Sequence, residues 1–217
     1  MRFLIVLFVG LSVFASNAQQ SKTYTPGVFT KIKVSGHLEV SLHQADEYKV
    51  VLKYDKRIDL DDITVEVKGN DLKLAIVRGD YKDIKPKIDV YFKTVEEIRS
   101  FGNSYVETVE PIEQQSIDLE AQAGGHLHVD FKGTSLDARI AQGGRIVLKG
   151  SAETIDLKVS TGGTIAAFLI DSDQVAAKIN AGGEIQTIDF DEDGDMDVLA
   201  FNSANRLVLY ENFDHGS

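Results

Sequence analysis

Apolar and polar residues alternate along most of the chain, which is the pattern of β-strands that bury one face. Ile32 and Val34 alternate with lysines, and every second residue from Leu38 to Leu42 is apolar. The same period of two recurs through the region that follows. We therefore predict an all-β protein whose N-terminal part, residues 28–97, consists of short antiparallel strands.

One hairpin can be assigned within this region. Alternating apolar residues occupy 63–67 and again 72–76, and the turn-forming segment Lys68-Gly69-Asn70-Asp71 separates them. Turn residues between two alternating runs predict two antiparallel strands joined by a tight turn.

A glycine repeat dominates the second half. Four glycine pairs follow one another at intervals of 19, 19 and 20 residues: Gly124-Gly125, Gly143-Gly144, Gly162-Gly163 and Gly182-Gly183. A fixed period of this size indicates a solenoid of stacked units. We expect the glycines to allow a positive φ at each corner.

Apolar residues stand at constant distances from each pair and form four columns. Counted from the first glycine, they lie at −5 (Leu119, Ala138, Leu157, Ala177), −3 (Ala121, Ile140, Val159, Ile179), +3 (Leu127, Ile146, Ile165, Ile185) and +5 (Val129, Leu148, Ala167, Thr187). Alternate residues of a strand share a face, so these columns are predicted to point inward. Thr187 is the one polar member.

The repeat predicts a parallel β-helix of about five coils over residues 98–187, roughly 20–25 Å long. In the first, degenerate coil, Asn103-Ser104 stands in place of a glycine pair, and Ile98 and Val106 fall in the apolar columns. A β-sandwich with the pairs at hairpin turns is the alternative. It requires turn signals about every 8–12 residues, whereas each unit here has one strong turn and one weaker one, near Gly133 in one case.

The pattern resembles a known bacterial family. Two stretches carry the resemblance together with the Ala-Gly-Gly, Gln-Gly-Gly and Thr-Gly-Gly coils: Phe29-x-x-Ile32-x-Val34-x-Gly36 and Leu38-x-Val40-x-Leu42-x-Gln44. Residues 28–186 are similar to the auto-transporter adhesin head domain, or head GIN domain. The resemblance implies an extracytoplasmic β-helical domain of secreted bacterial proteins. It brings no catalytic residues.

An alternating acidic run follows the last coil. Its carboxylates are those of Asp189, Asp191, Asp193, Asp195 and Asp197, with Gly194 at the sixth position. Carboxylate and carbonyl oxygens are the ligands that Ca²⁺ prefers, and the glycine permits a sharp turn. Without a cation, so many neighbouring carboxylates would repel one another. The run predicts a Ca²⁺ site, and a solvated acidic turn is the alternative.

The flanking residues indicate which kind of calcium loop this is. An EF-hand needs Glu at position twelve, where this chain has Ala200. The run instead resembles the calcium loop of FG-GAP β-propeller repeats, and residues 198–201 and 207–210 would complete a hairpin. A single such unit cannot form a propeller. We therefore expect residues 188–217 to form a Ca²⁺-bearing hairpin that caps the open strand edges of the last coil.

The N-terminus has the character of a secretion signal. A positive start at Arg2, an apolar stretch from Phe3 to Phe14, and small residues at Ser16-Asn17-Ala18 predict a signal peptide over residues 1–18. A membrane anchor is the alternative, although a spanning helix needs roughly 20 apolar residues. After cleavage we expect no membrane span and a location in the periplasm, on the outer-membrane surface or outside the cell.

Composition narrows the partners. The chain has no Cys, which excludes disulfides and lipidation at a processed Cys, and its net charge is −11. An acidic chain repels phosphate backbones, so nucleic acid is not an expected partner, whereas cations are natural ligands.

Two outward-facing groups carry candidate chemistry. Asp118, Asp137 and Asp156 stand six residues before successive glycine pairs, beside a second column formed by Glu120, Arg139, Lys158 and Lys178. Stacking would place these carboxylates about 5 Å apart. They form either a catalytic or sugar-binding cluster or, as we favour, a ladder of exposed ion pairs.

His126 and His128 form the second group. They share one strand face and are either metal ligands or exposed polar residues, and no third ligand is evident in the sequence. We find no hydrolase, zinc-protease or phosphate-loop motif.

The sequence therefore predicts a non-enzymatic module for surface interaction or adhesion, with a structural Ca²⁺ site and a surface glycan or protein as partner. The alternatives are a carbohydrate-active enzyme or glycan-binding protein using the acidic face, and a periplasmic structural protein with no specific ligand.

Overall fold

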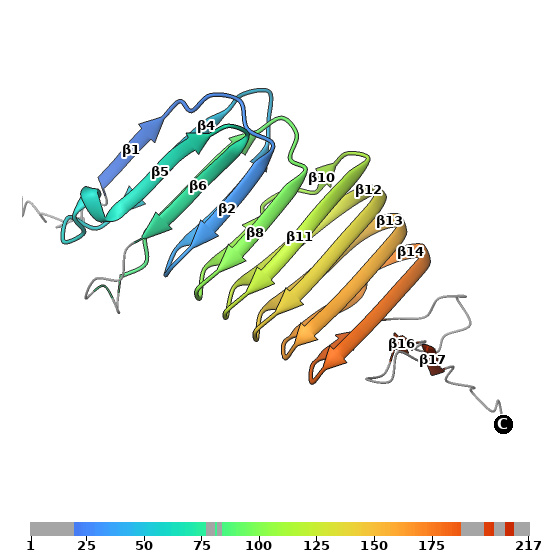
Figure 1. Cartoon of the computed structure of the whole chain (residues 1–217). Helices are drawn as coiled ribbons and strands as arrows, with labels where there is room; N and C mark the ends of the chain where they lie inside the picture. The colour runs from blue at the N-terminus through green and yellow to red at the C-terminus, as the bar shows by residue number, and fades with distance from the viewer. Residues whose placement is uncertain (1–19, 77–80, 82–83, 188–197, 202–206, 211–217) are drawn as a thin grey trace, which may run out of the picture.

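The computed structural model describes residues 20–76, 81, 84–187, 198–201 and 207–210, and for the last two segments it describes the backbone only. Strands stacked side by side make up most of this part of the chain (Figure 1). The single helical element within it is the 3-10 turn η1 at Leu60–Asp62. None of the described helices has the length and apolar character to cross a bilayer.

The strands follow one another with short connections. Their bounds are β1 Gln20–Tyr24, β2 Lys31–Ser35, β3 Glu39–Gln44, β4 Lys49–Tyr54, β5 Ile63–Lys68, β6 Asp71–Ile76, β7 Lys87–Phe92, β8 Glu97–Phe101, β9 Tyr105–Thr108, β10 Ile112–Glu113, β11 Ser116–Gln122, β12 His126–Ala141, β13 Arg145–Thr161, β14 Thr164–Ala181, β15 Glu184–Gln186, β16 Val198–Phe201 and β17 Leu207–Tyr210.

The strands form one continuous sheet wound into two facing ladders. Ladder A runs in the order β5, β6, β2, β8 and β11, followed by the second halves of β12, β13 and β14. Ladder B runs in the order β1, β4, β7, β3 and β9, followed by the first halves of β12, β13 and β14 and by β15.

The long strands bend where they pass from ladder B to ladder A. In β12 the buried residues are Leu127, Val129 and Phe131 before the bend, and Leu136 and Ala138 after it. The switch from odd to even numbers means that the chain has turned while its apolar side chains still point inward. Side chains from both ladders therefore fill one core.

Neighbouring coils pair in parallel. β11 pairs with β12, β12 with β13, β13 with β14 and β14 with β15. These pairings make four turns with a glycine pair, and β8 and β9 form the degenerate coil around Asn103-Ser104. The predicted parallel β-helix is confirmed, and the β-sandwich alternative is wrong.

The parallel stack extends further toward the N-terminus than expected. β2 and β3 pair in parallel with β8 and β9, and β6 and β7 pair in parallel with β2 and β3. Only β1, β4 and β5 pair antiparallel, at the N-terminal end of the stack. The prediction of antiparallel strands over 28–97 is therefore wrong for β2 and β3, because alternation reveals a buried face but not the direction of the neighbouring strand.

Two local predictions concern hairpins. β5 and β6 pair antiparallel from Ile63–Ile76 to Lys68–Asp71, which confirms the N-terminal hairpin. β16 and β17 also pair antiparallel, and β16 meets β14 through Phe201 and Lys178.

The core follows the predicted columns. All their members are buried except Ile179, which is half-buried, and even Thr187 is 3% exposed. The largest side chains of the core, Phe29, Phe92 and Phe131, are fully buried. Burying one such side chain contributes about 1.5–3 kcal/mol, so the columns supply the main stabilisation of the stack.

The two glycines of each pair have different roles. The first has a positive φ in every pair, which confirms the expected corner conformation. The second lies against the preceding coil: a Cβ at Gly125 would be 2.1 Å from the Ser100 carbonyl oxygen, and one at Gly144 would be 2.7 Å from that of Ala121. At each corner the next residue donates to the second-position carbonyl of the coil before, as when Arg145 donates to Gly125 at 3.0 Å.

The last glycine interval is one residue longer because β14 contains a bulge. Val147 pairs with Ala166 and Lys149 pairs with Leu169, so Leu148 opposes two residues. Beyond the bulge, Phe168 is 37% and Leu169 is 51% exposed.

These contacts predict unequal costs for two glycine substitutions. Gly125→Ala should lower the free energy of unfolding by about 3 kcal/mol or more, because the Ser100 carbonyl must move. Gly143→Ala should lower it by only about 1–2 kcal/mol, the cost of a left-handed alanine, because nothing lies within 4 Å of its Cβ. Urea unfolding followed by circular dichroism measures both, and equal losses would contradict the assignment.

Candidate functional site

The outward face of ladder A carries two columns of charged residues. The register places Glu97, Asp118, Asp137 and Asp156 on successive rungs, and the neighbouring column contains Arg99, Glu120, Arg139, Lys158 and Lys178. The predicted stacking of the three aspartates is therefore confirmed.

Cations stand beside these carboxylates. Lys158 Nζ lies 2.6 Å from an oxygen of Asp156, and Arg139 Nη2 lies 3.4 Å from one of Asp137 and 4.0 Å from one of Asp118. Arg99 Nε lies 3.2 Å from an oxygen of Glu120. The favoured interpretation, a ladder of exposed ion pairs, is confirmed. Such pairs contribute little to stability one by one, but they offset the repulsion of stacked like charges.

Asp118 differs from its neighbours in the column. Burial raises the pKa of its carboxyl above the usual 3.8, and the adjacent Asp137 raises it further, whereas Arg139 acts in the opposite direction. A carboxyl with a raised pKa beside a second carboxylate is an arrangement that acid–base enzymes use.

Ladder B contains a second candidate, a pocket at a break in the sheet. β9 ends at Thr108, the chain leaves the ladder, and β10 rejoins β12 at Ile112. Pro111 lies in the excursion and has no N–H to donate to a neighbouring strand.

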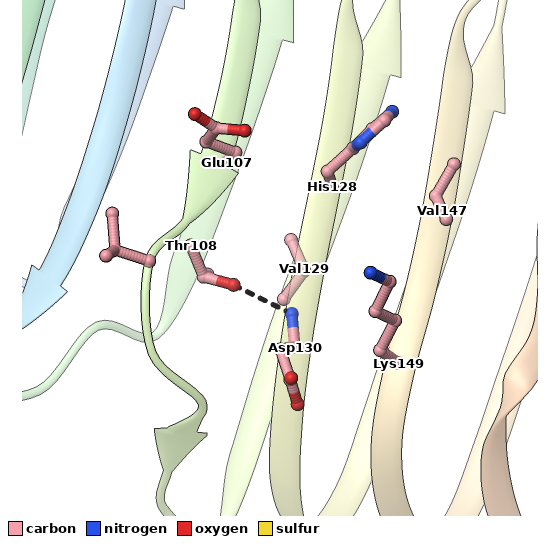
Figure 2. Close-up of a pocket in the computed structure, with 8 residues that line it drawn as sticks. Glu107, Thr108, His128, Val129, Asp130, Val147 and Lys149 are labelled. Atoms are coloured by element: carbon pink, nitrogen blue, oxygen red, sulfur yellow. Dashed lines mark hydrogen bonds between the residues drawn. The ribbon is translucent and has the colours of Figure 1, made fainter.

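A pocket of about 190 Å³ opens beside this excursion (Figure 2). We call it the ladder-break pocket, and its lining comprises Glu107, Thr108, Val109, His128, Val129, Asp130, Val147 and Lys149.

Hydrogen bonds fix the walls of the ladder-break pocket. The Asp130 amide, deprived of a strand partner, donates to Thr108 Oγ1 at 2.8 Å. The Tyr105 hydroxyl donates to Glu107 at 3.1 Å and lies 3.1 Å from His128 Nδ1. Since the hydroxyl proton goes to Glu107, Nδ1–H of a neutral His128 donates to Tyr105, and Nε2 remains an acceptor.

Burial shifts the pKa values of this group. It raises the pKa of Tyr105 to about 12, and the bond to Glu107 acts in the same direction. It lowers the pKa of His126, with help from Arg145, and that of His128, although Glu107 partly opposes the shift at His128. Both imidazoles are therefore neutral at pH 7.

The predicted metal ligands have different outcomes. Asp189, Asp191, Asp193, Asp195 and Asp197 lie outside the described residues. His126 and His128 share an outward face, as expected, and His128 meets Tyr105. Within the described part of the chain, no three His, Cys, Asp or Glu residues are grouped so as to hold a metal ion.

Sequence reasoning missed the ladder-break pocket, although a signal was present. The step from Asn103 to Gly124 is 21 residues, two more than the regular 19. The register shows where the extra residues go: Tyr105 pairs with His126 but Ile112 pairs with Phe131, so the surplus lies between β9 and β10. Together with Pro111, the long step locates an outward excursion.

The lowered histidine pKa values predict how stability depends on pH. In the unfolded chain these imidazoles bind protons below pH 6.5, whereas in the fold they resist protonation, so the free energy of unfolding should fall as the pH drops below 6.5. His128→Gln should reduce the slope. Urea unfolding at several pH values measures it, and NMR titration of both imidazoles with midpoints at or above 6.5 would contradict the assignment.

Comparisons with known proteins agree with the architecture. Residues 28–192 match the family described as "Putative auto-transporter adhesin, head GIN domain". A solved structure of a putative adhesin from Bacteroides fragilis is similar with a TM-score of 0.70 and 21% identity, covering 78% of this chain and 80% of that one. A putative adhesin from Parabacteroides merdae has a TM-score of 0.60 and 20% identity, with the same coverage of 78% and 80%.

A third similar structure, named as a putative lipid binding protein from Parabacteroides distasonis, has a TM-score of 0.58 and 15% identity, and it covers 78% of this chain and 94% of that one. At such identities the likeness shows the fold alone. No curated protein matches the chain. The family match spans most of the sequence, and the chain therefore belongs to the head GIN domain family of auto-transporter adhesins.

Proposed function

We propose that this protein is a non-enzymatic surface-interaction module, an adhesin-like head whose outward columns of side chains contact a glycan or protein on another surface. The observation that carries the proposal is the register of the parallel ladders, which holds outward residues of successive coils in straight rows. Rows of this kind form an extended, rigid contact surface at low entropic cost to the binder. The family name points in the same direction.

Carbohydrate chemistry at the acidic face is the second candidate. The raised pKa of Asp118 beside Asp137 favours it, since glycosidases pair a protonated carboxyl with an ionised one. The ion pairs of Asp137 and Asp156 weigh against it, because a carboxylate held by a cation is a poorer base.

The proposal includes an extracytoplasmic location and a calcium site. The location is supported by the leader-like residues 1–18, the absence of Cys and the adhesin family. The calcium site is supported by the donor set of Asp189, Asp191, Asp193, Asp195 and Asp197, which supplies the hard oxygen ligands that Ca²⁺ prefers. The ion would be structural and would hold a hairpin against the last coil.

Binding and hydrolysis separate the two candidate functions. The mature chain from Gln19, coated on beads, should adhere to glycan arrays or bacterial surfaces without releasing sugar products. Release of products from polysaccharides, abolished by Asp137→Asn, would instead establish the enzyme. If neither adhesion nor product release occurs, the surface-interaction proposal is wrong and the structural alternative gains support.

Calcium should stabilise the fold. For a site with the millimolar to submillimolar affinity of extracellular modules, 10 mM Ca²⁺ should add about 1.5–3 kcal/mol and raise Tm by roughly 3–10 °C over EDTA. Asp193→Asn should reduce the shift, whereas Asp173→Asn, at an exposed position of β14, should leave it intact. Identical melting curves with and without Ca²⁺, together with no heat of Ca²⁺ binding in calorimetry, would refute the site.

A further inference from the structure

The ladder-break pocket has features that the ion-paired face of ladder A lacks. It exists because two extra residues leave ladder B between Thr108 and Ile112, so that backbone positions of β12 lose their strand neighbour. The Thr108 side chain satisfies the freed Asp130 amide at 2.8 Å, which keeps the break open without an unpaired buried donor at that amide (Figure 2).

The charged groups of the pocket are not engaged with one another. Asp130 and Lys149 face each other across adjacent strands in register, yet neither makes an ion pair or a side-chain hydrogen bond with any residue of the described ranges. On ladder A, by contrast, Asp156 and Lys158 are 2.6 Å apart. The side chains of Asp130 and Lys149 are therefore both available to a ligand.

The lining mixes hydrogen-bond types without a dominant charge. Glu107 and Asp130 offer acceptors, Lys149 offers donors, and the neutral His128 offers an acceptor at Nε2. Val147 contributes an aliphatic wall. An anion would meet two carboxylates, and a cation would meet an ammonium group. A ligand whose groups both donate and accept, and which also has a C–H face, is suited to all of them.

We propose that the ladder-break pocket binds a single neutral sugar ring, such as the terminal residue of a surface glycan. A volume of about 190 Å³ is below the ~300 Å³ at which sites for drug-sized ligands begin, so the pocket admits one ring and its hydroxyls but not an oligosaccharide. Asp130 and Glu107 accept from ring hydroxyls, Lys149 donates to one, and Val147 contacts the C–H face. The inference rests on the proposed adhesive function and names its contact site.

Titration of the ¹⁵N-labelled mature protein with four methyl glycosides (of glucose, mannose, galactose and N-acetylglucosamine) tests the pocket. At least one glycoside should shift the amide signals of His128 and Asp130 with a dissociation constant in the millimolar range, as expected for one shallowly bound ring. Asp130→Asn and Lys149→Met should each weaken binding about tenfold or more, since each removes a charged hydrogen-bond partner.

Matched substitutions on the opposite face serve as controls. Asp137→Asn and Lys158→Met alter the same residue types on ladder A and should leave the titration unchanged, and dispersed spectra establish that every variant is folded. Three outcomes overturn the proposal: no saturable shift with any glycoside, shifts that persist in both pocket variants, or stronger shifts with acetate or methylammonium than with the sugars.

Bead adhesion separates this inference from the proposed function. If wild-type beads adhere and both pocket variants adhere equally well, the protein is adhesive through another surface and the pocket assignment is wrong. If wild-type beads do not adhere but the glycoside titration succeeds, the pocket binds sugar and the adhesive function fails.

Discussion

Each coil of this protein is held by backbone hydrogen bonds to the coil before it, and the register of those bonds is the constraint on which the other features depend. Because a strand repeats its side-chain direction every second residue, a slip of one residue would turn the whole apolar set outward. The glycine pairs prevent such a slip. The first glycine turns the corner, and the second lets the next coil approach the carbonyl groups beneath it.

Irregular surfaces arise where the count of residues per coil departs from 19. One extra residue in the last long coil becomes the bulge in β14 that exposes Phe168 and Leu169. Two extra residues in the coil before Gly124 become the excursion that opens the ladder-break pocket. In both cases the inward residues keep their places, because the core tolerates no gap, and the surplus is expelled to the outside.

Much of the solenoid could be predicted from the sequence, since its columns recur at fixed distances from glycine and burial follows alternation. The direction of β2 and β3 could not, because parallel and antiparallel neighbours bury the same alternating face and the partner strands lie far away in the chain. The ion-pair ladder was accessible, since stacked positions follow from the period. The ladder-break pocket was missed: it depends on the position of extra residues within a coil, which only the pairing of Ile112 with Phe131 reveals.

The same stacking gives the protein a mechanical character. A coil at the end of the stack is bonded to a neighbour on one side only, so a pull on the chain end loads one row of hydrogen bonds at a time and leaves the rows behind it at rest. Each coil that peels away releases a contour of about 65 Å, from 19 residues at roughly 3.4 Å each. Under tension the molecule would therefore lengthen in equal steps, and it would absorb a sudden load as a succession of small yields rather than one rupture.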